Sequence, residues 1–127
     1  MLIKTALKLV NSISDKRPQV SDDPSVADLD AWRNRIDAID VAVMNLLNER
    51  SVCANKIGLI KKHNGMPVYV PSRETEVIAN VVSSNPGPLP DQAVRRLFER
   101  IIDETRSLER HLYQEEPLSG EGDPHDD

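Results

Sequence analysis

Three basic residues on one predicted helix have the types and spacing needed to hold a small dianion. Arg50 interrupts a stripe of apolar residues on this helix. Lys61 follows eleven residues later, so its direction around the helix differs from that of Arg50 by about 20°, and the two residues are about 16 Å apart along the helix axis. Two long cationic side chains at that separation can converge on one ligand. Arg33 lies on the same predicted helix about 25 Å from Arg50, too far to reach that ligand from one straight helix. A second, antiparallel copy would bring its own Arg33 to the Arg50–Lys61 region, and two-fold symmetry would then form two equivalent sites.

Other polar residues are predicted to face the same core. Glu74 begins a second predicted helix, four residues before Ile78 on its apolar stripe. Thr105 and Glu109 are four residues apart on a third predicted helix and continue its inward line. A carboxylate and a hydroxyl at core-facing positions, together with the cations, indicate a polar cavity inside an aliphatic bundle. A stable core without a ligand would not hold so many polar groups.

Taken one at a time, these residues also have ordinary structural explanations. Arg50 could form a structural ion pair, or pack its stem while its head reaches solvent. Glu74 could simply be an acid favoured by the dipole at a helix start, and a core-facing threonine hydroxyl often bonds back to its own helix. Glu109 could pair with Arg106 or Arg110. The sequence alone leaves both interpretations open.

The elements that must position these side chains are helices. The pattern predicts a very long first helix over about 29–63, ended by Asn64 and Gly65. A second helix is predicted from Pro71–Ser72 to the proline-rich break at 85–90, and a third from about Asp91, as N-cap, to about Tyr113. A helix as long as the first needs a partner along its whole stripe. We therefore expect an all-α fold, a three-helix subunit in an intertwined homodimer.

The predicted inward residues of the first and third helices repeat at steps of three and four. They are Leu29, Trp32, Ile36, Ile39, Val43, Leu46, Cys53, Ile57 and Ile60 in the first, and Val94, Leu97, Phe98, Ile101, Ile102, Leu108 and Leu112 in the third.

Length and composition favour one small domain. The chain has 127 residues, of which 39% are hydrophobic and only 3% aromatic, so an aliphatic helical core is expected. We expect a flexible N-terminal arm over 1–26, a folded domain over 27–114 and a disordered acidic tail over 115–127. The tail holds six acids and no Lys or Arg, and the remaining chain is close to neutral. This charge distribution offers no basic face for nucleic acid.

Cysteine usage and hydropathy favour a cytoplasmic protein. The lone Cys53 excludes an internal disulfide and suits a reducing compartment. No apolar run approaches the roughly 20 residues that a membrane span needs. The N-terminal stretch MLIKTALKLV contains two lysines and no small-residue cleavage site follows it, so we do not expect a signal peptide. The three histidines are far apart and show no zinc-ligand spacing, so no metal is expected.

Four sequence blocks resemble the all-helical chorismate mutase family over residues 29–113. They are LDAWRNRIDAIDVAVMNLLNER, IGLIKK, PVYVPSRE and RLFERIIDETRSLE, in the family's order and with matching separations. The resemblance implies an interlocked dimer in which each site takes one Arg from the other subunit. It also implies a cofactor-free isomerase that converts chorismate to prephenate in phenylalanine and tyrosine biosynthesis. Docking to another aromatic-biosynthesis enzyme, as occurs with some free-standing mutases, is left open.

The resemblance also implies roles for the three cations. Arg33 resembles the arginine donated across the dimer, and Arg50 the arginine that clamps a substrate carboxylate. Lys61 resembles the lysine that holds a carboxylate and the ether oxygen. Chorismate carries two carboxylates, and its rearrangement requires no nucleophile, metal or general base. A site rich in cations is what orientation and charge stabilisation of such a dianion need.

Five further positions match the family's substrate-binding residues. Arg73 and Glu74 match an Arg–Glu pair in which the Glu receives the ring hydroxyl. Thr105 stands where relatives have Ser or Thr in contact with a carboxylate. Val70 replaces the Asp of some relatives, so that only its backbone N–H could contribute, and Glu109 stands where relatives have Gln or Glu facing the ether oxygen. Only a protonated Glu109 could donate a hydrogen bond there.

Two other functions are compatible with this pattern. Isochorismate-pyruvate lyases resemble the mutases in fold and clamp a similar dianion, although the third-helix pair and Lys61 favour the mutase. A non-catalytic helical dimerisation module, with its cations merely paired, is the alternative from a different class. The product formed from chorismate would discriminate among the three.

Overall fold

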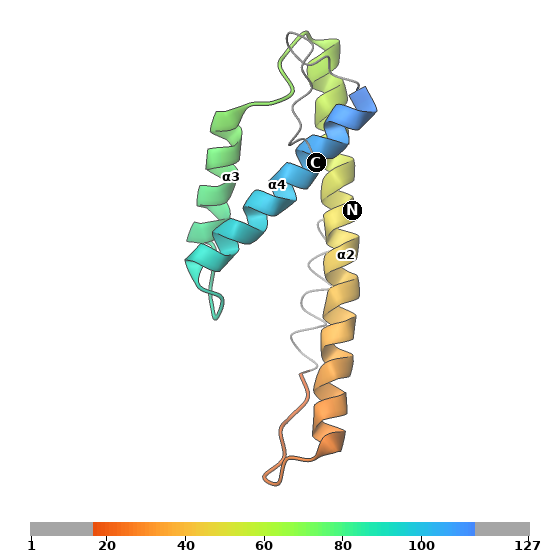
Figure 1. Ribbon diagram of the computed structural model, residues 1–127, viewed down its shortest axis with the longest axis vertical. Helices are drawn as coiled ribbons and strands as arrows, with labels where there is room; N and C mark the ends of the chain where they lie inside the picture. Colours follow the sequence, from red (N-terminus) through yellow and green to blue (C-terminus); the bar gives the residue numbers. More distant parts are fainter. Residues whose placement is uncertain (1–16, 114–127) are drawn as a thin grey trace. The chain divides into compact units, whose positions relative to one another are not determined.

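The computed structural model of the chain describes residues 17–113, which form three helices (Figure 1). They are α2 over Val26–His63, α3 over Pro71–Ser83 and α4 over Asp91–Tyr113. The described residues contain no strand, which confirms the predicted all-α class. The 38 residues of α2 confirm the very long first helix. Residues 1–16 of the predicted arm and the predicted acidic tail lie outside the described residues.

The chain divides into two compact units at the bond between Val52 and Cys53, within α2. The N-terminal unit therefore carries Arg33 and Arg50. The C-terminal unit carries Lys61 and the polar residues assigned to the connection before α3, to α3 and to α4.

Helix α2 begins after a polar turn whose groups bind one carboxylate of its first turn. The amide of Ser25 donates to Oδ2 of Asp28 at 2.9 Å, and the Ser21 hydroxyl donates to the same oxygen at 2.7 Å. The Ser25 carbonyl accepts from the amide of Leu29 at 3.2 Å, so Ser25 occupies the N-cap position. The acid reaching back to the N-cap amide is one half of a capping box. Residues of the predicted arm thus contribute to the start of the helix.

We expect the charge of Asp28 to support this helix start only above acidic pH. The hydrogen bond from Ser21, and then the one from the Ser25 amide, lower the pKa of Asp28 from its usual 3.8. A lowered pKa in the folded state means that this stabilisation is present above the unfolded-state pKa. It is lost as the pH falls through the folded-state value. Ser21→Ala should therefore move the Asp28 pKa back toward its usual value in a carboxyl-carbon NMR titration. Ser83→Ala, in α3, is the control, and an unchanged titration in the Ser21 variant would contradict the assignment.

The apolar stripe of α2 is largely exposed in a single chain. Leu29 and Ile36 are 47% and 54% exposed, and Ile57 and Ile60 are similarly open to solvent, whereas Ala42 is buried. Isolated exposed apolar residues are common, but a repeated row of them along one helix is typical of a surface that another element covers. The prediction that a second copy covers this stripe stays a prediction.

Helices α3 and α4 pack against each other within the C-terminal unit (Figure 1). Val94 and Ile102 of α4 are buried, as their spacing predicts. Leu97 and Leu108, also predicted to be inward, are exposed in the single chain. Leu97 lies about 100° around the helix from Phe98, so it stands at the edge of the stripe. The predicted inward position of Leu112 is not tested, because its side chain lies outside the described residues.

The connections on either side of α3 end one helix and start the next. The amides of Asn64 and Gly65 bond back to carbonyls of α2, and Gly65 has a φ of 67°, which confirms the predicted stop. Pro71 opens α3, where its missing N–H costs nothing. Asp91 is the first residue of α4 and not its N-cap, because the Pro90 carbonyl already accepts from the amides of Ala93 and Val94.

None of the helices described over 17–113 combines the length and the apolar character needed to cross a membrane.

Candidate active site

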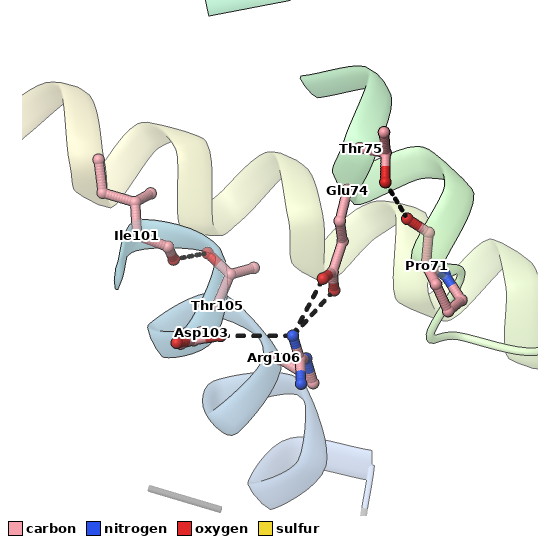
Figure 2. A network of polar contacts seen from close by, with 7 residues as sticks. All are labelled: Pro71, Glu74, Thr75, Ile101, Asp103, Thr105 and Arg106. Atoms are coloured by element: carbon pink, nitrogen blue, oxygen red, sulfur yellow. Dashed lines mark hydrogen bonds and ion pairs between the residues drawn. The ribbon is translucent and has the colours of Figure 1, made fainter. Parts of the chain in front are cut away.

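A carboxylate of α3 and a guanidinium of α4 meet in the C-terminal unit (Figure 2). Nη2 of Arg106 lies 3.0 Å from Oε1 and 3.1 Å from Oε2 of Glu74. The two side chains are 32% and 26% exposed, so their attraction is less screened by water than that of a surface pair. The predicted inward position of Glu74 is therefore occupied by an acid that an inter-helix ion pair holds in place.

Arg106 is the polar residue of this region that the sequence reasoning did not assign to the site. Its Nη2 also lies 3.3 Å from Oδ1 of Asp103, and its guanidinium carbon lies 4.5 Å from the centre of the Tyr69 ring. Its Nε is buried and has no partner among the described residues. The spacing in the sequence could have indicated its inward position. Arg106 follows Ile102 by four residues, so the two side chains lie on the same face of α4, and Ile102 is buried.

Lys61 lies at the end of α2 and reaches the following connection. Its Nζ donates to the carbonyl of Val68 at 3.2 Å, and its own carbonyl accepts from the amide of Met66 at 2.8 Å. The lysine side chain is half-buried. Val70, at the end of the same connection, is half-buried and has extended backbone as the N-cap residue of α3.

Thr105 and Glu109 lie one turn apart on α4, and both are half-buried. The Thr105 hydroxyl donates to the Ile101 carbonyl at 2.9 Å, so the expected back-bond to its own helix is present (Figure 2). A hydroxyl has one hydrogen, so contact with a substrate carboxylate, which can only accept, would require the hydroxyl to exchange this bond for one to the ligand.

Arg73 points away from its neighbour Glu74. It forms a 2.6 Å ion pair with Glu76, and both of these side chains are about 60% exposed. Successive helical residues differ by about 100° in direction, which separates Arg73 from Glu74 despite their adjacency. An exposed pair of this kind contributes at most about 1 kcal/mol and can be exchanged for another partner. The binding role assigned to Arg73 stays a prediction.

The N-terminal unit places its two assigned arginines in different environments. Arg33 is exposed, as a residue donated to a second subunit would be, whereas Arg50 is half-buried. Over the described part of the chain, no cluster of three His, Cys, Asp or Glu side chains is arranged to hold a metal ion.

Comparison with known proteins places this set of residues in a family. The family model described as chorismate mutase type II matches residues 32–110, which include every residue assigned above. The chain belongs to the chorismate mutase type II family.

Solved chorismate mutases share the architecture. The chorismate mutase of Thermus thermophilus (form II) is 35% identical, with a TM-score of 0.63 over 65% of this chain and 93% of that chain. Its form I superposes with a TM-score of 0.60 over 61% and 96% of the two chains. The three-helix fold is therefore a chorismate mutase fold.

The relatives of this chain include longer proteins that are named bifunctional. The bifunctional chorismate mutase/prephenate dehydratase of Neisseria gonorrhoeae is 44% identical over 80 residues, 63% of this chain and 22% of that protein. The protein of the same name from Aquifex aeolicus is 35% identical over 89 residues, 67% of this chain and 25% of that protein. The chain thus spans about a quarter of the length of these relatives. The 4-amino-4-deoxychorismate mutase of Streptomyces pristinaespiralis is 34% identical over 93 residues, 72% of this chain and 69% of that protein.

Proposed function

We propose that this chain is a chorismate mutase, which rearranges chorismate to prephenate within one substrate molecule. The observation that carries the proposal is the family match over 32–110, because it contains all eight residues predicted for the site. Domain boundaries near 27 and 114, which lie outside that match, stay part of the proposal. A cytoplasmic location rests on the lone Cys53 and is likewise a prediction.

The proposed catalysis acts through position and charge. The substrate is flexible and must be compressed into a chair-like reactive geometry. This ordering costs entropy, and binding in a pre-formed site offsets that cost before the reaction step. Cleavage of the C–O bond builds negative charge on the ether oxygen. Lys61 and a protonated Glu109 would stabilise that charge more strongly in the transition state than in the ground state.

The remaining assigned residues would bind the ends of the substrate. Arginines present planar donors that match a carboxylate better than lysine does, and Arg50 together with Arg33 of a second copy fits that task. The Thr105 hydroxyl as a donor, the Val70 amide and Arg73 complete the predicted binding set. Glu74 would accept a hydrogen bond from the ring hydroxyl. Its two carboxylate oxygens already accept from Arg106, but each can accept a further hydrogen bond.

The proposed active form is a homodimer with shared sites. In its support, the stripe of α2 exposes Leu29, Ile36 and Ile60 in a single chain, an apolar surface that a second copy of α2 would cover. The exposure of Arg33 leaves its guanidinium available to another subunit. Each site would then join one Arg33 to the Arg50 and Lys61 of the other chain.

A second candidate substrate is 4-amino-4-deoxychorismate, in which an amine replaces the ring hydroxyl. The relative from Streptomyces pristinaespiralis carries that activity in its name and is covered over 69% of its length. Glu74 is an acceptor and could receive a hydrogen from either substituent. Relatives that carry a prephenate dehydratase in the same chain favour chorismate as the substrate and prephenate as the product. They also support docking to a separate enzyme of that kind, as part of the proposal.

The purified chain should consume chorismate and release prephenate, because its assigned cations fit the dianion. Chorismate loss is followed by absorbance and the product is identified by chromatography, with Arg50→Ala as the inactive control. The same assay with isochorismate tests the lyase, whose product is pyruvate. Intact chorismate after prolonged incubation would show that the proposal is wrong and would favour the dimerisation module.

A further inference from the structure

The Glu74–Arg106 pair differs in kind from the surface pairs of the same unit. It joins α3 to α4 across 32 positions of sequence, and about two thirds or more of each side chain is shielded from solvent. The pair Arg100–Glu104, by contrast, runs along α4 with side chains 73% and 55% exposed. Because screening falls with burial, the charge of Arg106 acts on Glu74 more strongly than Arg100 acts on its partner.

The guanidinium of Arg106 is fixed by groups from three segments. Glu74 holds it from α3, Asp103 holds it from its own helix, and Tyr69 lies against it from the connection before α3. Figure 2 shows the Glu74 side chain extending from α3 to meet Arg106. A residue held in this way both sets the direction of the carboxylate and keeps a positive charge beside it.

The geometry leaves Glu74 able to bind a ligand. A single nitrogen, Nη2, donates to both carboxylate oxygens, where a two-nitrogen fork would occupy them more fully. Each oxygen keeps a lone pair, so Glu74 can still accept a hydrogen bond. What Arg106 removes is most of the net negative charge that an approaching cation would experience.

We propose that Arg106 is a positioning residue that also sets specificity, acting through Glu74 to favour a neutral ring substituent over a cationic one. The inference rests on the proposed function, in which Glu74 receives the ring hydroxyl. The hydroxyl of chorismate is neutral. The amine of 4-amino-4-deoxychorismate, like other aliphatic amines, is largely protonated near neutral pH. An ammonium gains from Glu74 but is repelled by Arg106, whereas a hydroxyl needs only the oriented acceptor.

The test compares kcat/KM for the two substrates in the full-length wild type and in Arg106→Gln. Loss of the positive charge should raise the ratio of amino to hydroxyl substrate about tenfold, a shift of about 1.4 kcal/mol. Loss of orientation should lower kcat/KM for chorismate itself. Arg106→Lys keeps the charge and should restore the wild-type ratio. Arg100→Gln, on the exposed face of the same helix, should leave both values unchanged.

The outcomes separate this inference from the proposed function. Equal losses for both substrates in Arg106→Gln would assign Arg106 a purely structural role and overturn the inference. Arg106→Met replaces the Gln variant if circular dichroism shows that the latter does not fold. If the wild type converts neither compound, the proposed function is wrong, and calorimetric affinities for the same two compounds decide the inference. An unchanged affinity ratio between wild type and variant, or no binding of either compound, then overturns it.

Discussion

Replacing Glu109 with alanine should lower kcat/KM for chorismate about a hundredfold at acidic pH, where the wild-type carboxyl is protonated, and should leave an enzyme that is poor at every pH. Glu109 lies half-buried on α4, one turn beyond Thr105, at the position assigned to the ether oxygen. Removing a hydrogen-bond donor aimed at charge that develops in the transition state typically costs roughly 3 kcal/mol. Glu104→Ala, on the exposed face of the same helix, is the matched control and should retain activity.

The Glu109→Gln variant isolates the role of the proton. Only the protonated acid can donate to the ether oxygen, so wild-type activity should fall as the pH rises through the pKa of this carboxyl in the substrate complex. Glutamine donates at every pH and has nearly the same shape, so it should flatten the alkaline limb and raise kcat/KM near pH 8. A glutamine variant with the wild-type pH profile would show that Glu109 does not face the ether oxygen.

Two inactive variants should regain activity when they are refolded together. Arg33→Ala and Arg50→Ala each damage every site of a homodimer in which one subunit lends Arg33 to the other. In a mixed dimer, one of the two sites receives both arginines intact. Random pairing makes about half of the dimers mixed, so about a quarter of the sites should recover.

The mixing experiment measures kcat per site after refolding, with each variant refolded alone as the control. Native mass spectrometry confirms that mixed dimers have formed. Inactive mixed dimers would remove the shared-site proposal while leaving the chemistry of the remaining residues in place. Activity in either variant alone would instead show that the affected arginine is not essential.

The helices were predictable because their signals are local. Apolar steps of three and four, the Asn64–Gly65 stop and the prolines around 85–90 each act within a few residues. The bounds found for α2, α3 and α4 therefore agree with the prediction to within a few residues. Helix α2 starts slightly before its predicted position, although Ser25 and Asp28 have capping-box spacing. Their position in a polar, proline-containing stretch hid that signal.

The site was less predictable, because its contacts depend on how helices pack. The pairing of Glu74 with Arg106 requires the register of α3 against α4, which no local pattern specifies. The sequence suggested Arg106 only as a partner for Glu109, a neighbour on its own helix. The contact of Arg73 with Glu76 was likewise not predicted, because the family resemblance groups Arg73 with Glu74. The sequence proposes the residues of the candidate site, but it did not predict the contacts that Glu74 and Arg73 make in the structure.

The hydrogen bond between Lys61 and Val68 determines how much freedom the ammonium has before a ligand arrives. A lysine side chain carries about 2 kcal/mol of rotamer entropy, and the bond from Nζ to the Val68 carbonyl at 3.2 Å restricts it during folding. An ammonium has three hydrogens to donate, and this bond uses one of them. Two remain, the number needed to hold a carboxylate and an ether oxygen together. Lys61 could then make both proposed contacts while its Nζ stays bonded to the Val68 carbonyl. The methylene chain of its side chain would already be ordered before the ligand binds.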